Sequence, residues 1–372
     1  MSERPASWTE VSLYDICNPK QWSTIPQTAF VEEGYPVYGA NGKIGYYTEF
    51  NHEKPTVLIT CRGATCGTIN VCEAKSYVTG NSMALDDLDE SRANLNFLVY
   101  ALRNRGLAKA ITGTAQPQIT RESLKAVSIA FPPLPGQRRI AEILDKADAL
   151  RAKRRAALAQ LDTLTQTVFI DMFGDPATNP KGWPRKCIGE IGEVITGNTP
   201  PRSNAAYYGV GIEWIKSDNI NTPHYYLTRA EEGLSEAGKA VARTAPAGSL
   251  LVTCIAGSPD CIGNAAMTDR EVAFNQQINA LIPRHGDPHF LYAQILVAKR
   301  LIQEASTGGM KGMVSKSRFE KIGITYPPLE LQHDFACRVQ AIEKLKTSHR
   351  ASLAEMDALF ASLQHRAFRG EL

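Results

Sequence analysis

The sequence has no long hydrophobic run. No stretch of about 18 apolar residues, the length that crosses a bilayer, occurs in the chain. The opening residues MSERPASWTE lack the apolar core of a secretory signal. The hydrophobic fraction of 43% over 372 residues is ordinary for a globular protein. We therefore expect a soluble intracellular protein of two or three domains with no membrane partner.

Closely spaced metal ligands are also missing. The eight cysteines are scattered, and those nearest to a cluster are Cys61, Cys66 and Cys72. Their spacing lacks the C-x2-C that places two thiolates on one zinc ion, and no nearby histidine completes a set of four ligands. We expect reduced thiols and no metal site.

Motifs that carry catalysis are absent as well. There is no G-x-x-x-x-G-K-[ST] phosphate loop, no H-E-x-x-H zinc motif, and no acid-x-Lys at short range after Asp260 for a metal-dependent nuclease. The stretch FPPLPGQ invites comparison with an amino-methyltransferase loop, which needs a polar residue before Pro-Pro and an aromatic residue after it. Here Phe131 precedes the prolines and Leu134 follows them. We therefore expect no catalytic residue in this chain.

The FPPLPGQ stretch occurs twice. It runs from Phe131 to Gln137 and recurs as YPPLELQ from Tyr326 to Gln332, 195 positions later. The match continues without gaps over about 60 positions, so the chain is a direct repeat of two domain-sized copies. The openings SWTEVSLYDI and GWPRKCIGEI also match, but at an offset of 175. The second copy therefore holds about 20 more residues in its middle, the difference between 195 and 175.

Each copy has a β-rich middle and a helical end. The middles contain short runs of Val, Ile, Thr and Tyr between Gly, Asn and Asp turns. After Gln137 and Gln332, apolar residues recur every 3.5 positions over about four heptads, which predicts two long helices that pair as an antiparallel coiled coil. We expect the following residues in the seam between the two helices: Ile143, Leu150, Arg154, Leu161, Leu164, Leu345, His349, Met356 and Leu359. The two polar ones, Arg154 and His349, could instead lie at the rim of the seam.

These patterns predict an α+β protein with two β-rich domains in tandem, each followed by a long helix. We place the first domain at residues 1–136, the first helix at 137–173 and a linker, GDPATNPKG, at 174–182. The second domain is expected at residues 183–331 and the second helix at 332–372.

Positive charge is concentrated between Tyr100 and Gln160. The net charge of the whole chain is only +3, but this segment holds twelve Lys or Arg against four acidic residues. Such a surplus fits a track for a polyanion, and a solvated helix face explains it equally well. Two β-rich domains held apart by helices could read two sites about one turn of B-DNA apart, roughly 34 Å. Because their middles differ, the two sites should differ too.

The chain resembles the specificity subunit of type I restriction-modification systems over nearly all of its length. The resemblance is carried by YPVYGANGKIGYY, NTPPRSNAAYYGVGIEWIKSDNI, VAFNQQINALIP and the two copies of aromatic-Pro-Pro-Leu-x-x-Gln before a helix. It implies that the β-rich domains are target recognition domains and that the helices are a spacer and a docking surface. The implied partners are double-stranded DNA, two methyltransferase subunits and restriction subunits, in a prokaryotic cytoplasm. The chain would carry no cofactor, while its partner subunits use S-adenosylmethionine, ATP and Mg²⁺.

The resemblance also implies DNA-contacting residues, although each could equally be a turn or surface residue. Asn, Gln and Arg side chains can contact base edges, and Lys and Tyr can contact the backbone. In the first domain we expect Asn41, Lys43, Tyr46, Tyr47, Arg62 and Asn81, and in the second Lys216, Ser217, Asp218, Asn219, Gln276 and Gln277, the last two of which could equally be hydrogen-bonding residues of the sheet core. Beside each Pro-Pro strand, Gln118, Arg121, Lys311 and Lys316 suit phosphate contacts.

Two other hypotheses remain open at this point. One is a fused restriction or modification enzyme that keeps a degenerate active site. The other is a duplicated β-rich adaptor that binds protein or glycan. Methyl transfer by the chain alone would favour the first, and an absence of sequence-selective, salt-sensitive DNA binding would favour the second.

Overall fold

The computed structural model describes residues 5, 7–40, 42–113, 116–307 and 312–372. The chain forms two compact units, and each contains one β-rich domain with parts of both long helices. The first unit consists of Met1–Arg155 with Ser352–Leu372, and the second consists of Ala156–Ala351. No helix among the described residues is long and apolar enough to cross a membrane.

The first unit contains strands β1 (Thr9–Ser12), β2 (Asn18–Gln21), β3 (Tyr35–Gly39), β4 (Gly42–Tyr47), β5 (Thr56–Thr60), β6 (Ile69–Cys72), β7 (Tyr77–Val78), β8 (Ser82–Asp86) and β9 (Ser128–Phe131), and helices α1 (Leu95–Arg105) and α2 (Arg121–Leu124). Part of each long helix, α3 (Leu134–Phe173) and α9 (Leu329–Ala367), completes it.

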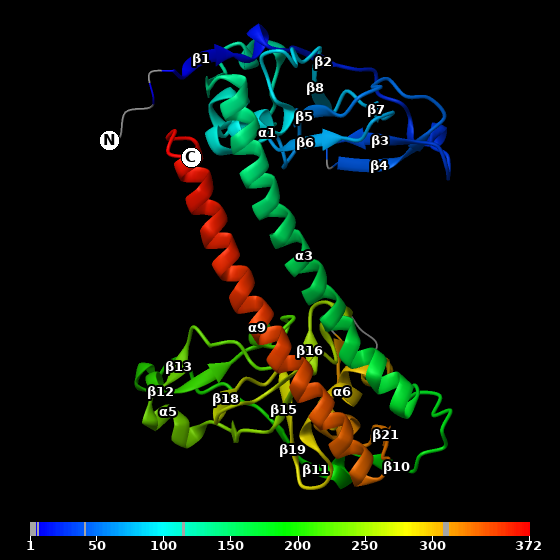
Figure 1. Cartoon of the computed structure of the whole chain (residues 1–372). Coiled ribbons are helices and arrows are strands. Elements are labelled where there is room, and N and C mark those ends of the chain that lie inside the picture. Colours follow the sequence, from blue (N-terminus) through cyan, green and yellow to red (C-terminus); the bar gives the residue numbers. More distant parts are fainter. Residues whose placement is uncertain (1–4, 6, 41, 114–115, 308–311) are drawn as a thin grey trace. The chain divides into compact units, whose positions relative to one another are not determined.

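The core of the first domain lies on both faces of an antiparallel sheet with strand order β2-β8-β5-β6 (Figure 1). Side chains along a strand alternate between its faces. Val57 and Ile59 of β5 accordingly join the cluster that contains Phe97 of α1. Leu58, between them, joins a second cluster with Tyr38 of the sheet β4-β3-β7. Because both faces are covered, the three middle residues of this central strand, Val57, Leu58 and Ile59, are all apolar.

The second unit contains β10 (Arg185–Cys187), β11 (Gly192–Thr196), β12 (Tyr208–Ile215), β13 (Gly233–Leu234), β14 (Thr244–Ala245), β15 (Leu250–Thr253), β16 (Ile255–Ala256), β17 (Ala265–Met267), β18 (Val272–Phe274), β19 (Ile278–Pro283), β20 (Gly312–Met313) and β21 (Gly323–Thr325). Its helices, besides parts of α3 and α9, are α4 (Ile188–Ile191), α5 (Glu236–Val241), α6 (Pro288–Val297), α7 (Lys299–Glu304) and α8 (Lys316–Glu320).

The second domain repeats the plan of the first. Its antiparallel sheet has the order β11-β19-β15-β17, and a second sheet has the order β13-β12-β18-β14. Leu250 and Val252 of β15 face the cluster that contains Phe290 of α6, whereas Leu251 faces the cluster of the other sheet. The two domains therefore share one arrangement, a sheet buried between a helix and a second sheet.

The strand predicted before each Pro-Pro is confirmed. Residues Ser128–Phe131 form β9, which pairs antiparallel with β1, and β21 pairs in the same way with β10. The helices begin at Leu134 and Leu329, earlier than the expected residues 137 and 332. The reason is that Leu follows the second proline directly, and proline's fixed φ suits the residue just before or at a helix start.

The glutamine of each repeated motif is a buried connector. Gln137 Oε1 accepts the Asn94 backbone N–H at 2.8 Å, and its Nε2 donates to the Pro132 carbonyl at 2.9 Å. Gln332 does the same with the Asp287 N–H at 3.0 Å and the Pro327 carbonyl at 2.8 Å. Asn94 and Asp287 are the N-cap residues of α1 and α6. Each Gln therefore ties the start of a domain helix to the start of a long helix.

Replacing Gln332 by Leu should lower the free energy of unfolding of the second unit by about 1–3 kcal/mol per unmet group, because a buried N–H and a buried carbonyl lose their partner. Chemical denaturation of the purified chain would measure this loss. Gln160 is exposed on α3 and provides the control, since Gln160→Leu should change stability by less than about 0.5 kcal/mol. Equal effects of the two substitutions would contradict the connector role.

The long helices pair antiparallel within each unit. In the first unit Arg151 Nε lies 2.6 Å from Asp357 Oδ1, and in the second Lys346 Nζ lies 3.2 Å from Asp162 Oδ1. These two pairs are related by the repeat, since Arg151 and Lys346, like Asp162 and Asp357, are 195 positions apart. The ion pairs therefore follow the internal symmetry of the chain.

The predicted seam is wrong for its four outer leucines. Leu150, Leu164, Leu345 and Leu359 are between 38% and 57% exposed. Ile143, Leu161, Met356, Arg154 and His349 are half-buried. The positions next to Leu150 and Leu345, Arg151 and Lys346, turn inward instead. A helix with 3.6 residues per turn drifts away from a strict 3.5-residue pattern, and the long stems of Arg and Lys can cover the apolar surface.

Candidate nucleic-acid interface

Backbone hydrogen bonds bring four segments of the first domain together. The N–H of Thr79, after β7, donates to the carbonyl of Tyr38 in β3 at 2.9 Å. The N–H of Cys61, after β5, donates to the Asn81 carbonyl at 3.0 Å, and the Cys61 carbonyl accepts the Ile119 N–H at 2.9 Å. The ends of β3, β5 and β7 and the segment around Gln118 therefore meet at one edge of the domain.

Side-chain hydrogen bonds fix the β3–β4 hairpin to this edge. Thr60 Oγ1 at the end of β5 donates to the Ala40 carbonyl at 2.7 Å, and Ser82 Oγ of β8 donates to the Gly39 carbonyl at 3.1 Å. Gly42 starts the return strand with φ of 87°, a conformation that favours glycine. The hairpin is thus held where its exposed residues can share a surface with those that follow β5.

Two predicted residues are direct partners at this edge. Arg62 and Gln118 lie opposite each other in an antiparallel bridge, and both are exposed. Side chains of directly opposed residues in an antiparallel pair point to the same face. Asn81 is exposed. It lies beside this pair, because its backbone carbonyl accepts the N–H of Cys61, the residue before Arg62. Arg62, Asn81 and Gln118 therefore present donors and acceptors together.

The aromatic and basic residues of β4 flank the edge. Lys43 Nζ lies 4.4 Å from the centre of the Tyr46 ring. A side-chain hydrogen bond with Tyr46 raises the pKa of Lys43. Tyr47 packs edge-on against Tyr77 at 5.3 Å between ring centres, so it contributes to the domain. Among the described residues, Lys43, Arg62 and Arg121 have no ion-pair partner within 4.0 Å, so their charges are available to an anion.

The second domain has the same edge. The Asn275 N–H donates to the Ile215 carbonyl at 3.0 Å, the Cys254 N–H to the Gln277 carbonyl at 2.8 Å, and the Val314 N–H to the Cys254 carbonyl at 2.8 Å. These bonds repeat those of Thr79, Cys61 and Ile119. Gln277 therefore stands where the first domain has Asn81. In the second domain Ile255 of β16 pairs with Met313 of β20. By the same alignment these two residues correspond to Arg62 and Gln118 of the first domain.

The polar residues of the second edge form more ion pairs and hydrogen bonds within their own domain than those of the first edge. Lys216 Nζ contacts Glu232 at 2.6 Å, and Arg202 binds the same carboxylate. Hydrogen bonds from Arg202 and then Lys216 lower the pKa of Glu232 to about 2. Asn219 uses its side chain within the domain, accepting the Lys216 N–H at 3.0 Å and donating to the Arg229 carbonyl at 3.0 Å.

Several predicted residues have simpler surroundings. Gln276 is exposed and its Oε1 accepts a hydrogen bond from Thr199, while Gln277 Oε1 accepts from Asn275 Nδ2 at 3.0 Å. Asp218 is exposed and Ser217 is half-buried in the same turn. Two further predicted residues start short helices instead: Arg121 starts α2, and Lys316 starts α8 and pairs with Glu320 at 3.6 Å. Asn41 and Lys311 lie outside the described residues.

The cysteines that follow the central strands of the two domains are not activated nucleophiles. Burial raises the pKa of the Cys61 thiol to about 11 and that of Cys254 to about 12, so both stay protonated at neutral pH. In the part of the chain that the structure describes, no group of His, Cys, Asp and Glu could hold a metal ion. The edges offer hydrogen bonds, charge and apolar contacts, which suit recognition.

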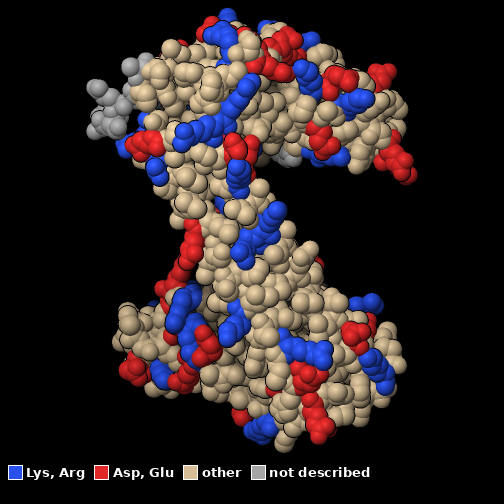
Figure 2. All heavy atoms as spheres, in the orientation of Figure 1, with Lys and Arg blue, Asp and Glu red and all other residues tan. Residues whose placement is uncertain are grey.

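Sequence reasoning missed Ile255, Met313, Arg202 and Glu232. A search for polar side chains overlooks an apolar pair, and the fixed offset of 195 fails where the domains differ in length. The Thr-Cys pair at the end of each central strand, in TCRG and TCIAG, is the signal that could have aligned Arg62 with Ile255. Figure 2 shows Lys and Arg mixed with Asp and Glu on each unit, so charge alone does not outline the interface on this face.

Comparison with known proteins supplies the family. Residues 5–160 and 180–356 match the model of the type I restriction modification DNA specificity domain. The specificity subunit of the type I restriction enzyme HindI from Haemophilus influenzae is 30% identical over 199 residues, 52% of this chain and 42% of that protein. The MjaIX specificity subunit from Methanocaldococcus jannaschii is 31% identical over 165 residues, 42% of this chain and 37% of that protein. The matches span less than half the length of these two curated relatives.

Solved structures agree on the fold. The S subunit of a type I restriction-modification system from M. genitalium has a TM-score of 0.66 and 17% identity, and the match covers 97% of this chain and 96% of that one. A chain from a study of complex assembly in the type I R-M system has a TM-score of 0.58 and 18% identity over the full length of both. With a family model that matches both halves of the repeat, the chain belongs to the type I restriction-modification DNA specificity domain family.

Proposed function

We propose that this chain is the specificity subunit of a type I restriction-modification complex and that its two domains read the two halves of an asymmetric DNA site. The observation that carries the proposal is the edge that recurs in both domains, built from the same backbone hydrogen bonds but lined with different side chains. One plan with two sets of side chains suits two half-sites of different sequence. Base edges are the part of DNA that such side chains distinguish.

The long helices are proposed as the spacer between the half-sites and as the docking surface for two methyltransferase subunits. Within the first unit, Leu150 precedes Arg151, and Leu359 lies two positions after the Asp357 that Arg151 binds. Leu164 and Leu345 are placed in the same way beside the ion pair of the second unit. Exposed leucines next to ion pairs on both helices suit a partner that covers them.

Catalysis is assigned to the partners. In this proposal the methyltransferase subunits use S-adenosylmethionine, the restriction subunits use ATP and Mg²⁺, and this chain contributes DNA selection alone. The thiols of Cys61 and Cys254, whose pKa values burial raises, agree with a recognition role.

Methylation mapping tests the proposal. The chain is co-expressed with its methyltransferase subunit in a host that lacks adenine methylation, and methyladenine is located by single-molecule sequencing. We expect modification at one bipartite, non-palindromic motif, and none when either protein is expressed alone. Methyl transfer to DNA by the purified chain alone, or modification without a defined motif, would overturn the proposal.

A further inference from the structure

The two edges differ most at one pair of opposed residues. Arg62 and Gln118 face each other in the first domain, and Ile255 and Met313 face each other in the second. The equivalence rests on the cysteines that precede Arg62 and Ile255. The backbone N–H of each cysteine donates to the residue just before a strand, Asn81 before β8 or Gln277 before β19. The backbone carbonyl of each accepts the N–H of the residue that follows Gln118 or Met313. The same backbone position therefore carries two hydrogen-bonding side chains in one domain and two apolar ones in the other.

The apolar pair is open to contact. Met313 is 41% exposed, and Ile255 is half-buried. Opposed residues of an antiparallel pair point to one face, so the two side chains form a single apolar contact surface. Gln277 lies directly beside it, because its carbonyl accepts the Ile255 N–H at 3.1 Å as well as the Cys254 N–H. The surface is thus apolar at its centre and has an amide side chain next to it.

Duplex DNA offers one apolar group at a base edge. In the major groove guanine, adenine and cytosine present hydrogen-bonding atoms, and thymine adds its 5-methyl group. Phosphates give no reason for an Ile and a Met, since neither side chain can donate a hydrogen bond to them. Met is flexible and polarizable, so it can adapt to the rounded surface of a methyl group.

We propose that Ile255 and Met313 contact the 5-methyl group of a thymine in the half-site that the second domain reads. The inference rests on the proposed function and deepens it by assigning one base. It also states why the two half-sites differ at this position: the first domain places Arg62 and Gln118 where the second places an apolar pair. Gln277 then serves the neighbouring base or the complementary strand by hydrogen bonding.

The test uses the native protein and altered DNA. Once methylation mapping has defined the motif, duplexes are made in which uracil replaces each thymine of the second domain's half-site in turn, which removes only the methyl group. We expect the assembled complex to bind one of these duplexes about fourfold more weakly, the factor that burial of one methyl-sized group gives. Uracil at thymines outside both half-sites is the control and should leave binding unchanged.

A transplant of side chains gives a second measurement. Ile255→Arg combined with Met313→Gln copies the first domain's pair into the second domain. We expect the methylated motif to change at one base pair of one half-site, while the other half-site and the assembly with methyltransferase subunits stay the same. The unchanged half-site shows that the variant is folded, and the half-site that changes is the one read by the second domain.

Each failure has its own signature. If the wild-type complex yields no bipartite motif, the proposed function fails. If the motif exists but uracil at every position leaves binding within error, or the half-site contains no thymine, the thymine contact is refuted. A double variant that keeps its motif and loses assembly with the methyltransferase would also refute it, because the apolar pair would then bind protein.

Discussion

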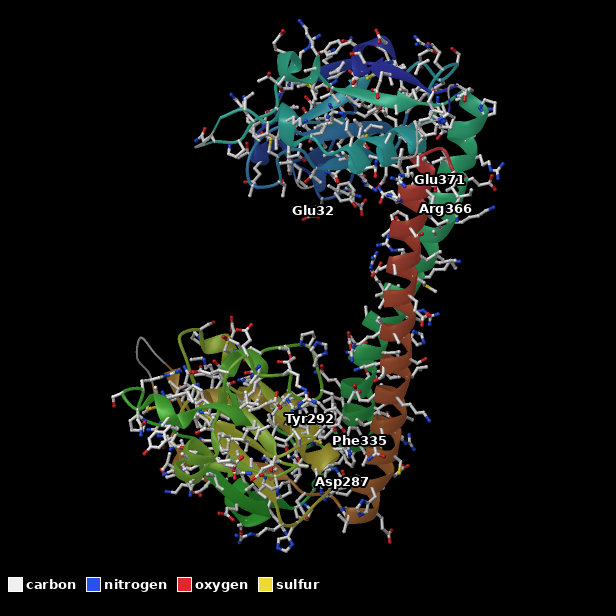
Figure 3. All side chains as sticks on the ribbon, turned by 90° about the vertical axis from the view of Figure 1, so that its left-hand side faces the viewer. Glu32, Asp287, Tyr292, Phe335, Arg366 and Glu371 are labelled. Atoms are coloured by element: carbon white, nitrogen blue, oxygen red, sulfur yellow. The ribbon has the colours of Figure 1, made fainter. Side chains whose placement is uncertain are left out.

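Replacing Phe335 by Ala is expected to destabilise the second unit by about 4 kcal/mol, the cost of removing a fully buried aromatic ring. Phe335 of α9 is 0% exposed and packs against Phe169 and Phe173 of α3, with ring centres 5.5 and 5.6 Å apart. Its ring also contacts Phe290 of α6 edge-on at 6.3 Å. In Figure 3 Phe335 lies near Asp287 and Tyr292, where α6 meets α9 in this unit. The substitution would leave a cavity shared by three helices.

Urea denaturation followed by tryptophan fluorescence would measure this loss, since Trp183 and Trp214 both belong to the second unit. Leu345→Ala is the matched control on the same helix. Leu345 is 47% exposed, so we expect a change below about 0.5 kcal/mol. A larger loss from Leu345→Ala than from Phe335→Ala would mean that the 3.5-residue seam is buried after all and that the observed packing is wrong.

Arg62→Ala is expected to weaken specific DNA binding by the assembled complex about 10- to 100-fold, because one bidentate contact to a base contributes roughly 1–3 kcal/mol of discrimination. Arg62 is exposed, opposite Gln118, with no ion-pair partner among the described residues. We also expect relaxed specificity at one base pair of one half-site. Competition binding with duplexes that vary each position in turn would measure both effects.

The control for this prediction lies at the other end of the same strand. Lys54 precedes β5, whereas Arg62 follows it, and Lys54 Nζ pairs with Glu90 at 2.9 Å on the surface. Lys54→Ala should leave affinity and specificity unchanged. If Arg62→Ala instead lowers affinity equally for all sequences and reduces the salt dependence by about one charge, Arg62 contacts a phosphate and the base-reading role is wrong.

Local sequence patterns predicted much of the fold. The prolines after Phe131 and Tyr326 end strands β9 and β21 and introduce α3 and α9, because proline cannot donate a ladder hydrogen bond and has a φ that suits a helix start. The sequence places a glutamine at each of these junctions, but it does not predict what the glutamine side chain binds. Only the structure shows that Gln137 and Gln332 are buried and bond to N-cap residues more than 40 positions away.

Helix contacts could not be read from periodicity. The 3.5-residue pattern selects Leu150 and Leu345, whereas the structure turns Arg151 and Lys346 inward and binds them to Asp357 and Asp162. An apolar side chain is equally expected in a helix seam or on a face that a partner protein covers. The outcome depends on which side of each helix is turned toward its neighbour. That rotation is set by contacts between residues far apart in the sequence.

The sequence by itself determined that the chain is a tandem repeat, that each copy is β-rich before its Pro-Pro and helical after it, and that Arg62, Asn81, Gln118 and Gln277 are recognition candidates. Turn residues, prolines and apolar periods act over a few positions, so they are visible in one dimension. Tertiary structure alone decided that Gln277 corresponds to Asn81 and that Ile255 occupies the place of Arg62, opposite the Met313 that the repeat already aligns with Gln118. The physical reason is that hydrogen bonds between strands, which fix these equivalences, join residues far apart in a chain whose two copies differ in length.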